Sequence, residues 1–284
     1  MKILLIILAI FFPSTLIAKA DTSITGQVEN VELNIKEHEA AVTFLGLSAG
    51  EATLVQGPNN ENILINAGGK GTKAELESWL SLYNIKEIST LILTNNGQEL
   101  SYNKINQVIT KYNIKEIITT PELSKLLAKN LDQSIPISFI SWVEGTKKEI
   151  FPEMTAEVQF VGNEPNEGMD LMLNFFEHNI FLMTSFSHRA EQTLLKKNLK
   201  DVNVFKIPNS NKEDPLSDQL IQYLNPQISI LFAVKEHQPN LNILHDLHGI
   251  WSEVYITKKH GTVTIKFTES NYEVITIPAE VEEK

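Results

Sequence analysis

Ser48 lies in the segment that most resembles a nucleophile site, Gly46-Leu47-Ser48-Ala49-Gly50. This segment matches the G-x-S-x-G pattern, which needs a strand before the serine and a helix after it so that the hydroxyl stands exposed. Here residues 51–55 continue in a strand pattern instead of a helix pattern. We therefore expect a tight turn at Ser48, and a serine hydrolase stays open as an alternative.

A second glycine-rich segment, Gly68-Gly69-Lys70-Gly71-Thr72, looks like a loop that could bind phosphate. It lacks the G-x-x-x-x-G-K-[ST] order of the Walker A motif. We expect a flexible turn here, with Thr72 as the N-cap of the following helix.

The chain has no cysteine, which excludes thiolate metal sites, so the histidines are the first candidates for metal ligands. No two of them have H-x-H or H-E-x-x-H spacing, and only His245 and His248 share a face of a predicted helix. A zinc site needs three or four converging ligands, so surface or partly buried roles are expected. The seven are His38, His178, His188, His237, His245, His248 and His260.

The elements that position these residues begin with three short strand patterns joined by turns, at 41–45, 52–55 and 63–65, which predict an antiparallel meander. Two helix–strand units follow. Their helices are marked by apolar residues at helical spacing, and their strands are expected at 89–94 and 117–119.

An internal repeat marks these two units. Residues 83–88 read Tyr-Asn-Ile-Lys-Glu-Ile, and the same six residues return at 112–117. Each copy lies where a helix ends, and asparagine tolerates the left-handed conformation that closes a helix. The spacing corresponds to one helix–strand unit, so the two strands are predicted to be parallel neighbours.

The second half of the chain has the same pattern of antiparallel strands and helix–strand units. The two halves together predict an α/β fold, a four-layer αβ/βα sandwich. Its expected strands are 156–161, 171–176, 180–184, 202–206, 228–233, 253–257, 262–267 and 273–277, and its expected helices are 189–198, 216–224 and 241–248.

Residues 1–20 have the pattern of a cleavable signal peptide. Lys2 precedes an apolar run, and Ala18-Lys19-Ala20 gives the small-x-small site before Asp21. The alternative is an uncleaved N-terminal anchor. The apolar run argues against it, because it is shorter than the roughly 18 apolar residues that span a bilayer and Pro13 interrupts it. We expect secretion or a cell-envelope location, with 21–38 as a polar leader and 39–284 as the folded domain.

The net charge and the apolar runs of the chain exclude some classes of binding partner. The chain has 24 Lys and Arg and 35 Asp and Glu, and residues 1–20 contain two of the lysines and no acid, so the mature charge is −13. This charge repels phosphate backbones, and no nucleic acid partner is expected. No second long apolar run exists, so no membrane association is expected after signal cleavage. The remaining expected partner is an unidentified exported or cell-envelope ligand.

Several segments resemble the metallo-β-lactamase superfamily, in particular the hydrolase domain of the competence protein ComEC. Residues 42–52 are similar to its opening "TFLDVGQGDA", and 63–69 to its "LIDAGG". Residues 91–94 resemble the strand that enters its metal motif, and 225–226 and 261–265 match its last third. The resemblance covers about 41–277 and implies a metal-dependent hydrolase fold.

The metal motifs of that family are missing. Where it has T-H-x-H-x-D-H, this chain has Asn95, Gly97 and Leu100 in place of histidines and Glu99 in place of the aspartate. The remaining replacements are Asn66 for the "LIDAGG" aspartate, Phe186 for the "LLTGD" aspartate, and Asn209 with its neighbours for "HHGS".

Zinc prefers imidazole, thiolate or carboxylate, so Glu99 is the one suitable ligand among these replacements and alone cannot hold the ion. Without the ion there is no activated water. We therefore expect no cofactor and a pseudo-hydrolase that binds or scaffolds, with Asn66, Asn95, Gly97, Glu99, Leu100, Phe186 and Asn209 lining a vestigial cleft. The alternative is a hydrolase that uses this cleft through an atypical or metal-free site.

Overall fold

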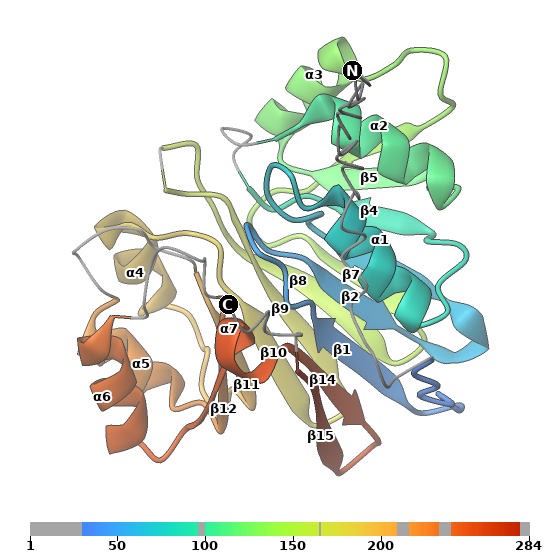
Figure 1. Cartoon of the computed structure of the whole chain (residues 1–284). Helices are drawn as coiled ribbons and strands as arrows, with labels where there is room; N and C mark the ends of the chain where they lie inside the picture. The colour runs from blue at the N-terminus through green and yellow to red at the C-terminus, as the bar shows by residue number, and fades with distance from the viewer. Residues whose placement is uncertain (1–29, 96–99, 165, 209–215, 233–239, 279–284) are drawn as a thin grey trace, which may run out of the picture.

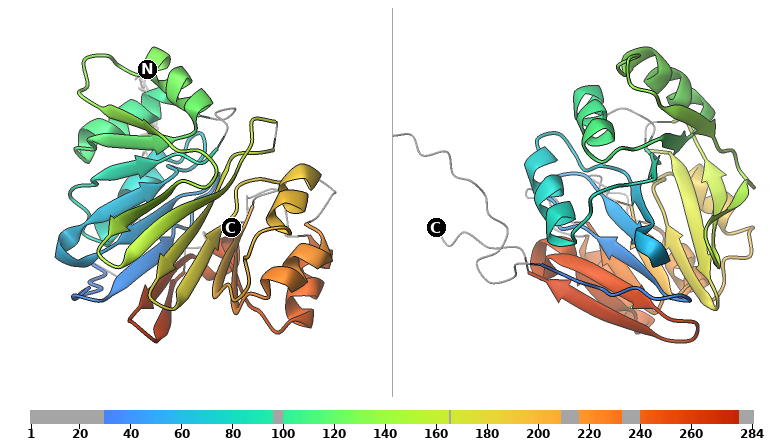
Figure 2. Two further views of the ribbon diagram at one scale, coloured as in Figure 1. Left: turned by 180° about the vertical axis from the view of Figure 1, so that it is seen from behind. Right: turned by 90° about the vertical axis from the view of Figure 1, so that its right-hand side faces the viewer.

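Two β-sheets face each other, and helices cover their outer faces (Figure 1). The computed structural model describes residues 30–95, 100–164, 166–208, 216–232 and 240–278. The helices of the two halves lie on opposite sides of the paired sheets (Figure 2). This is the predicted four-layer α/β sandwich.

The first sheet has eight strands in the order β15-β14-β1-β2-β3-β4-β5-β6. Antiparallel pairing joins β15, β14, β1, β2 and β3, whereas β3, β4, β5 and β6 are parallel. Its elements from the first half are β1 (Ala40–Phe44), β2 (Thr53–Gln56), η1 (Pro58–Asn60), β3 (Asn62–Ile65), α1 (Lys73–Leu82), β4 (Thr90–Ile92), α2 (Tyr102–Lys111), β5 (Glu116–Thr119), α3 (Pro121–Asn130) and β6 (Ser138–Ser141).

The second sheet has the order β13-β12-β11-β10-β9-β8-β7, with β7 to β10 antiparallel and β10 to β13 parallel. The remaining elements are β7 (Lys147–Phe151), β8 (Met154–Val161), β9 (Met169–Phe175), β10 (His178–Leu182), α4 (His188–Leu194), β11 (Val204–Ile207), α5 (Asp218–Leu224), β12 (Ile228–Leu231), α6 (Leu241–Gly249), β13 (Glu253–Ile256), α7 (Thr257–His260), β14 (Thr262–Phe267) and β15 (Tyr272–Ile277). Each sheet thus combines an antiparallel part with a parallel part.

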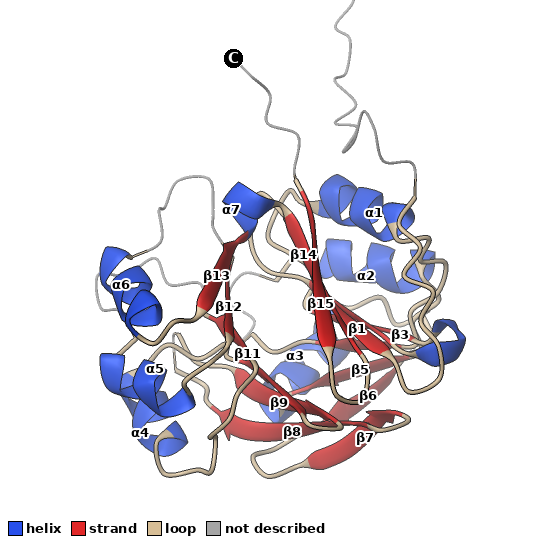
Figure 3. Cartoon of the chain, turned by 90° about the horizontal axis from the view of Figure 1, so that it is seen from below, coloured by secondary structure: helices blue, strands red, loops and turns tan. Residues whose placement is uncertain are grey.

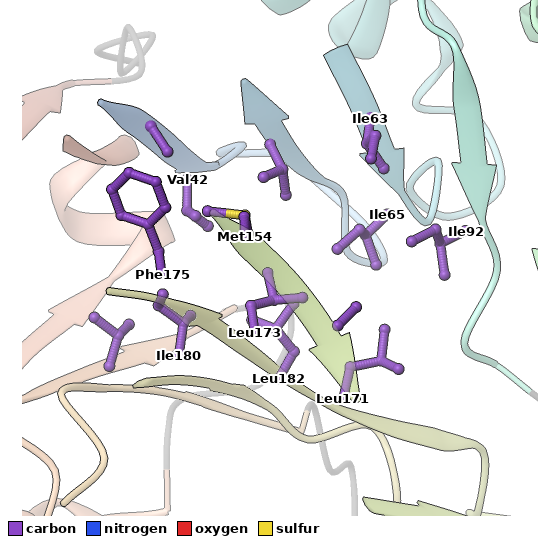
Figure 4. Packing of buried hydrophobic residues seen from close by; sticks show 14 of the residues in the cluster. Val42, Ile63, Ile65, Ile92, Met154, Leu171, Leu173, Phe175, Ile180 and Leu182 are labelled. Atoms are coloured by element: carbon purple, nitrogen blue, oxygen red, sulfur yellow. The ribbon is translucent and has the colours of Figure 1, made fainter. Parts of the chain in front are cut away.

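Three apolar clusters hold the layers together. The central one lies between the sheets, where residues such as Val42 and Ile65 from the first sheet face Leu171 and Leu182 from the second (Figure 4). A second cluster packs α1, α2 and α3 on the first sheet, and a third packs α4, α5 and α6 on the second. Figure 3 shows α1 and α2 outside the strands on one side and α4, α5 and α6 on the other.

The repeat behaves as its sequence predicts. Asn84 and Asn113 both have left-handed backbone, with φ of 54° and 55°, and β4 and β5 pair in parallel. The expected strands and helices are present with shifted ends; the helix expected at 189–198, for example, is α4 and ends at Leu194. The elements α3, β6, β7 and α7 were not predicted.

Residues 30–38 have no helix or strand, yet they contact the domain. Val31 donates its backbone N–H to the carbonyl of Leu82 at 2.8 Å, and Val31 and Leu33 pack against the second cluster. None of the described helices is long and apolar enough to cross a bilayer. The expected cleavage site at Ala18, Ala20 and Asp21 lies outside the described residues.

Candidate functional site

Asn66 is the first residue after β3 and the first of the expected cleft residues. Its backbone is left-handed, with φ of 59°, a conformation that asparagine tolerates better than most residues. The side chain is buried, and its Nδ2 donates to Thr94 Oγ1 at 2.8 Å. Its Oδ1 accepts the backbone N–H of Thr94 at 3.0 Å. The Asn66 amide therefore bonds to Thr94 through one of its N–H groups and through its oxygen, beyond the end of the neighbouring strand β4.

Thr94 also links the two sheets. Thr184, which follows β10, donates its hydroxyl to Thr94 Oγ1 at 2.9 Å. The carbonyl of Thr94 accepts the backbone N–H of Met169 at 2.8 Å. Asn95 and Gly168 form an isolated antiparallel bridge, and a Cβ at Gly168 would lie 2.3 Å from the Thr94 carbonyl oxygen. The two sheets thus make direct contact at the position where the metal motif would begin.

Asp170, on β9, is the buried acid of this region, with none of its surface exposed. Its Oδ1 accepts the backbone N–H groups of Thr184 and Ser185, both at 2.7 Å. Its Oδ2 has no hydrogen-bond partner among the described residues. Burial raises the pKa of Asp170 to about 6, although the two N–H groups and the Lys206 ammonium lower it.

Lys206 is buried on β11 and provides the positive charge here. It forms an ion pair with Glu51, which precedes β2 in the other sheet, and both side chains are almost fully buried. Its Nζ also donates to the Met183 carbonyl at 2.9 Å and lies 5.8 Å from the Phe232 ring. We call Asn66, Thr94, Thr184, Asp170, Lys206 and Glu51 the strand-end cluster.

Glu167 fixes the segment between β8 and β9 beside this cluster. Its side chain is buried, and Ser187 donates its hydroxyl to the carboxylate at 2.6 Å. Arg189 donates to both carboxylate oxygens, and its guanidinium lies over the Phe160 ring. These bonds tie the segment to the start of α4.

Two other expected cleft residues have apolar environments. Phe186 is half-buried and packs against the third cluster, on the helix-covered side of the second sheet. Leu100 packs against the second cluster, on the helix-covered side of the first sheet. Gly97, Glu99 and Asn209 lie outside the described residues, so the structure places only Asn66, Asn95, Leu100 and Phe186.

Among the described residues, the donor set does not make up the metal centre that the fold family implies. No group of three His, Asp or Glu side chains converges among the described residues. Of the two acids of the strand-end cluster, Glu51 pairs with Lys206, and Asp170 accepts two backbone N–H groups through Oδ1, which leaves only Oδ2 without a partner among the described residues. His245 and His248 are both exposed on α6.

Ser48 lies in a tight turn, as its sequence context indicates. Its backbone N–H donates to Glu75 Oε2 at 2.6 Å, and its hydroxyl donates to Glu75 Oε1 at 2.5 Å. The following segment continues into β2 and not into a helix. The described residues thus give Ser48 a structural partner, the Glu75 carboxylate on α1.

The glycine loop 68–72 packs directly on this turn. The N–H groups of Gly68 and Gly69 donate to the carbonyls of Glu51 and Ala49, so they do not face a phosphate. Thr72 stands at the N-cap position of α1, but the prediction that its side chain caps the helix is wrong. The Thr72 hydroxyl donates to the Gly69 carbonyl instead and accepts from Lys104 Nζ.

Sequence reasoning missed Lys206 and Asp170. Both are single charged residues inside apolar strand patterns, Val204-Phe205-Lys206-Ile207 and Met169-Asp170-Leu171-Met172. A charge in such a run must find a buried partner, because an unpaired buried charge is costly. That signal was available in the sequence, although it does not identify Glu51 as the partner.

Solved structures with the same architecture exist. The metallo-beta-lactamase fold protein YhfI from Bacillus subtilis superposes with a TM-score of 0.58 at 10% identity, over 83% of this chain and 99% of that one. A diphosphatase from the PhnP family gives 0.53 at 10% identity, over 84% and 100%. The chain has the metallo-beta-lactamase fold.

The Zn²⁺-bound PqqB from Methylobacterium extorquens shares this fold as well, with a TM-score of 0.52 at 8% identity over 76% of this chain and 97% of that one. No protein-family model and no curated protein sequence matches the chain. At these identities the likeness establishes the metallo-beta-lactamase fold and does not extend to activity.

Proposed function

We propose that this protein is a non-catalytic member of the metallo-beta-lactamase fold, related to the ComEC hydrolase domain, that binds or scaffolds a partner. The strand-end cluster carries the proposal. Most of its polar groups bond to one another or to backbone groups, and the buried Asp170 Oδ2, which has no partner among the described residues, is a single acceptor and not a set of converging ligands. A hydrolytic metal centre needs convergent imidazole and carboxylate ligands and an open position for water.

The bonds of Asn66 restrict where a ligand can bind. Its side chain is buried and is held on Thr94 through one N–H and its oxygen, so it presents little surface to a neutral ligand such as a sugar or a peptide. Asn95 is half-buried, and its backbone bridges to Gly168. An amide both donates and accepts, and loops at strand ends carry function on a rigid scaffold. We therefore assign ligand binding to the surface around Asn95.

The proposed place of action is outside the cytoplasm, on the strength of the signal-peptide pattern of residues 1–20. N-terminal sequencing of protein recovered from the cell exterior should give Asp21 as the first residue. An intact Met1 in a membrane fraction would contradict export with cleavage and would favour an N-terminal anchor.

A hydrolysis assay tests the non-catalytic assignment. The mature protein should not cleave phosphodiester, phosphomonoester or ester substrates above the protein-free rate, with or without added Zn²⁺, Mn²⁺ or Fe²⁺. Turnover that a chelator abolishes would support a hydrolase with an atypical metal site. Turnover that is lost in Ser48→Ala would support a serine hydrolase, and either result would overturn the proposal.

A further inference from the structure

Four strands form the edges of the two described sheets: β15 and β6 in the first sheet, and β13 and β7 in the second. Exposed edges attract other strands, and proteins commonly protect them with charged side chains. Three of the four contain such charges, Glu273 in β15, Glu253 in β13, and Lys147, Lys148 and Glu149 in β7. The edge strand β6, Ser138-Phe139-Ile140-Ser141, has none.

Apolar side chains are exposed around this edge. Ile140 on β6 is 39% exposed and Val143, which follows the strand, is 53% exposed. Leu126, on the helix α3 that packs beside β6, is 43% exposed (Figure 3). These are three of the seven large apolar residues that the described surface exposes, so the unprotected edge is also an apolar one.

The backbone of β6 has one free side. Ser138 and Trp142 donate their N–H groups towards β5, to the carbonyls of Lys115 and Thr119. Backbone groups of alternate residues in a strand point in opposite directions, so the N–H and C=O groups of Phe139 and Ser141 face away from β5. Both outward-facing residues are equally spaced from Ile140.

This spacing suits a two-fold axis. If a second copy pairs antiparallel about Ile140, Phe139 stands opposite the partner's Ser141, and Ser141 stands opposite the partner's Phe139. Both become hydrogen-bonded pairs, and Ile140 meets the partner's Ile140 as a non-hydrogen-bonded pair with Cα atoms about 4.5 Å apart. A two-fold interface of this kind is self-complementary.

The local charge around β6 is close to zero and does not oppose pairing with a second copy. The whole chain has a net charge of −11, which makes two copies repel each other. Residues 121–148, which contain β6 and its flanks, have four lysines against three acids and a net charge of +1. The acids are Glu122, Asp132 and Glu144, and the lysines are Lys125, Lys129, Lys147 and Lys148.

We propose that β6 is a dimer interface, where two copies of this chain pair antiparallel through Phe139 and Ser141 about a two-fold axis at Ile140. The proposal is independent of the function assigned above, because it concerns a sheet edge and not the strand-end cluster.

Cysteine cross-linking tests this arrangement, because the natural chain has no cysteine. In Ile140→Cys the two sulfur atoms would meet across the axis, and a Cα separation of about 4.5 Å permits a disulfide. Mild oxidation should therefore convert most of this variant to a covalent dimer. The control is Leu241→Cys on α6, which is more exposed, at 76%, and should remain mostly monomeric.

Sedimentation velocity of the mature protein supplies the second measurement. The parent should sediment as a dimer, Ile140→Lys and Ile140→Glu should each be monomeric, and an equal mixture of the two should recover the dimer. A parent that is monomeric at all concentrations would overturn the proposal. A dimer that persists in both charged variants, or equal cross-linking at positions 140 and 241, would overturn it as well.

Discussion

Lys206 and Glu51 form an ion pair between the two sheets, and both side chains are almost completely buried. Lys206 lies on β11 and Glu51 lies ahead of β2, so the pair joins the two halves of the chain. Asp170 is close enough for the ammonium to lower its pKa. The strand-end cluster therefore has an internal cation of its own.

Removing that cation should be costly. In Lys206→Met the Glu51 carboxylate stays buried without a counter-charge, and we expect the free energy of unfolding to fall by about 3–5 kcal/mol. Urea denaturation measures it. The control is Lys147→Met, which breaks the exposed pair with Glu157 and should cost less than about 1 kcal/mol. Equal losses in the two variants would contradict a buried pair.

Asp170 should make stability depend on pH in a defined direction. Its folded-state pKa of about 6 lies above the ordinary value of 3.8, so the folded state holds this proton more tightly than the unfolded state does. As pH rises from about 4 to about 6, the unfolded state loses the proton first and the contribution of Asp170 to stability falls. The fall is up to about 3 kcal/mol and is complete above pH 6.

The comparison with Asp170→Asn isolates this effect, because the variant lacks the titrating group. Denaturation at a series of pH values should show the free energy of unfolding of the variant rising relative to that of the parent between about pH 4 and 6. Above that range the difference between the two free energies should be constant. A difference that does not change with pH would mean that Asp170 has an ordinary pKa.

Restoring the aspartate of the family motif should not restore its chemistry. Asn66→Asp places a carboxylate where the buried amide now donates to Thr94, and we expect a loss of about 1–3 kcal/mol at neutral pH. Isothermal titration with Zn²⁺ should show no tight site in this variant.

Asn113→Asp is the matched control for that change. Asn113 has nearly the same backbone, with φ of 55°, but it is exposed, so the same substitution should change stability by no more than about 0.5 kcal/mol. If Asn66→Asp gains a tight zinc site, the cluster is closer to a metal centre than its hydrogen bonds indicate.

Ser48 should be inert. Its hydroxyl donates to Glu75, and no histidine bonds to it among the described residues, so a fluorophosphonate probe should leave the protein unlabelled. Ser48→Ala should instead lower the free energy of unfolding by about 1–2 kcal/mol, because a hydrogen bond to a charged group is lost. Labelling that disappears in Ser48→Ala would identify a nucleophile.

Local patterns predicted the layers, the antiparallel meander of β1, β2 and β3, and the parallel pair β4 and β5. The repeated Tyr-Asn-Ile-Lys-Glu-Ile segment placed two left-handed asparagines and two parallel strands correctly. The sequence also contained signals for α3 that went unused. Thr120 accepts the N–H of Leu123 as an N-cap, and Pro121 occupies the first turn.

The strand-end cluster could not be predicted in the same way, because its bonds join residues far apart in the chain. The motif comparison singled out Asn66, but not that Thr94 would take up its amide or that Thr184 would reach Thr94 from the other sheet. Thr72 shows the same limit, since a lysine from α2 and a neighbouring carbonyl use the hydroxyl that local rules assign to a cap.

The metal content of the mature protein, purified without a chelator and without a histidine tag, tests the central claim most directly. Elemental analysis should find zinc, manganese and iron far below one ion per chain, because the strand-end cluster is bonded within itself. One or two ions per chain that survive dialysis would contradict this account and would show that other residues supply the ligands.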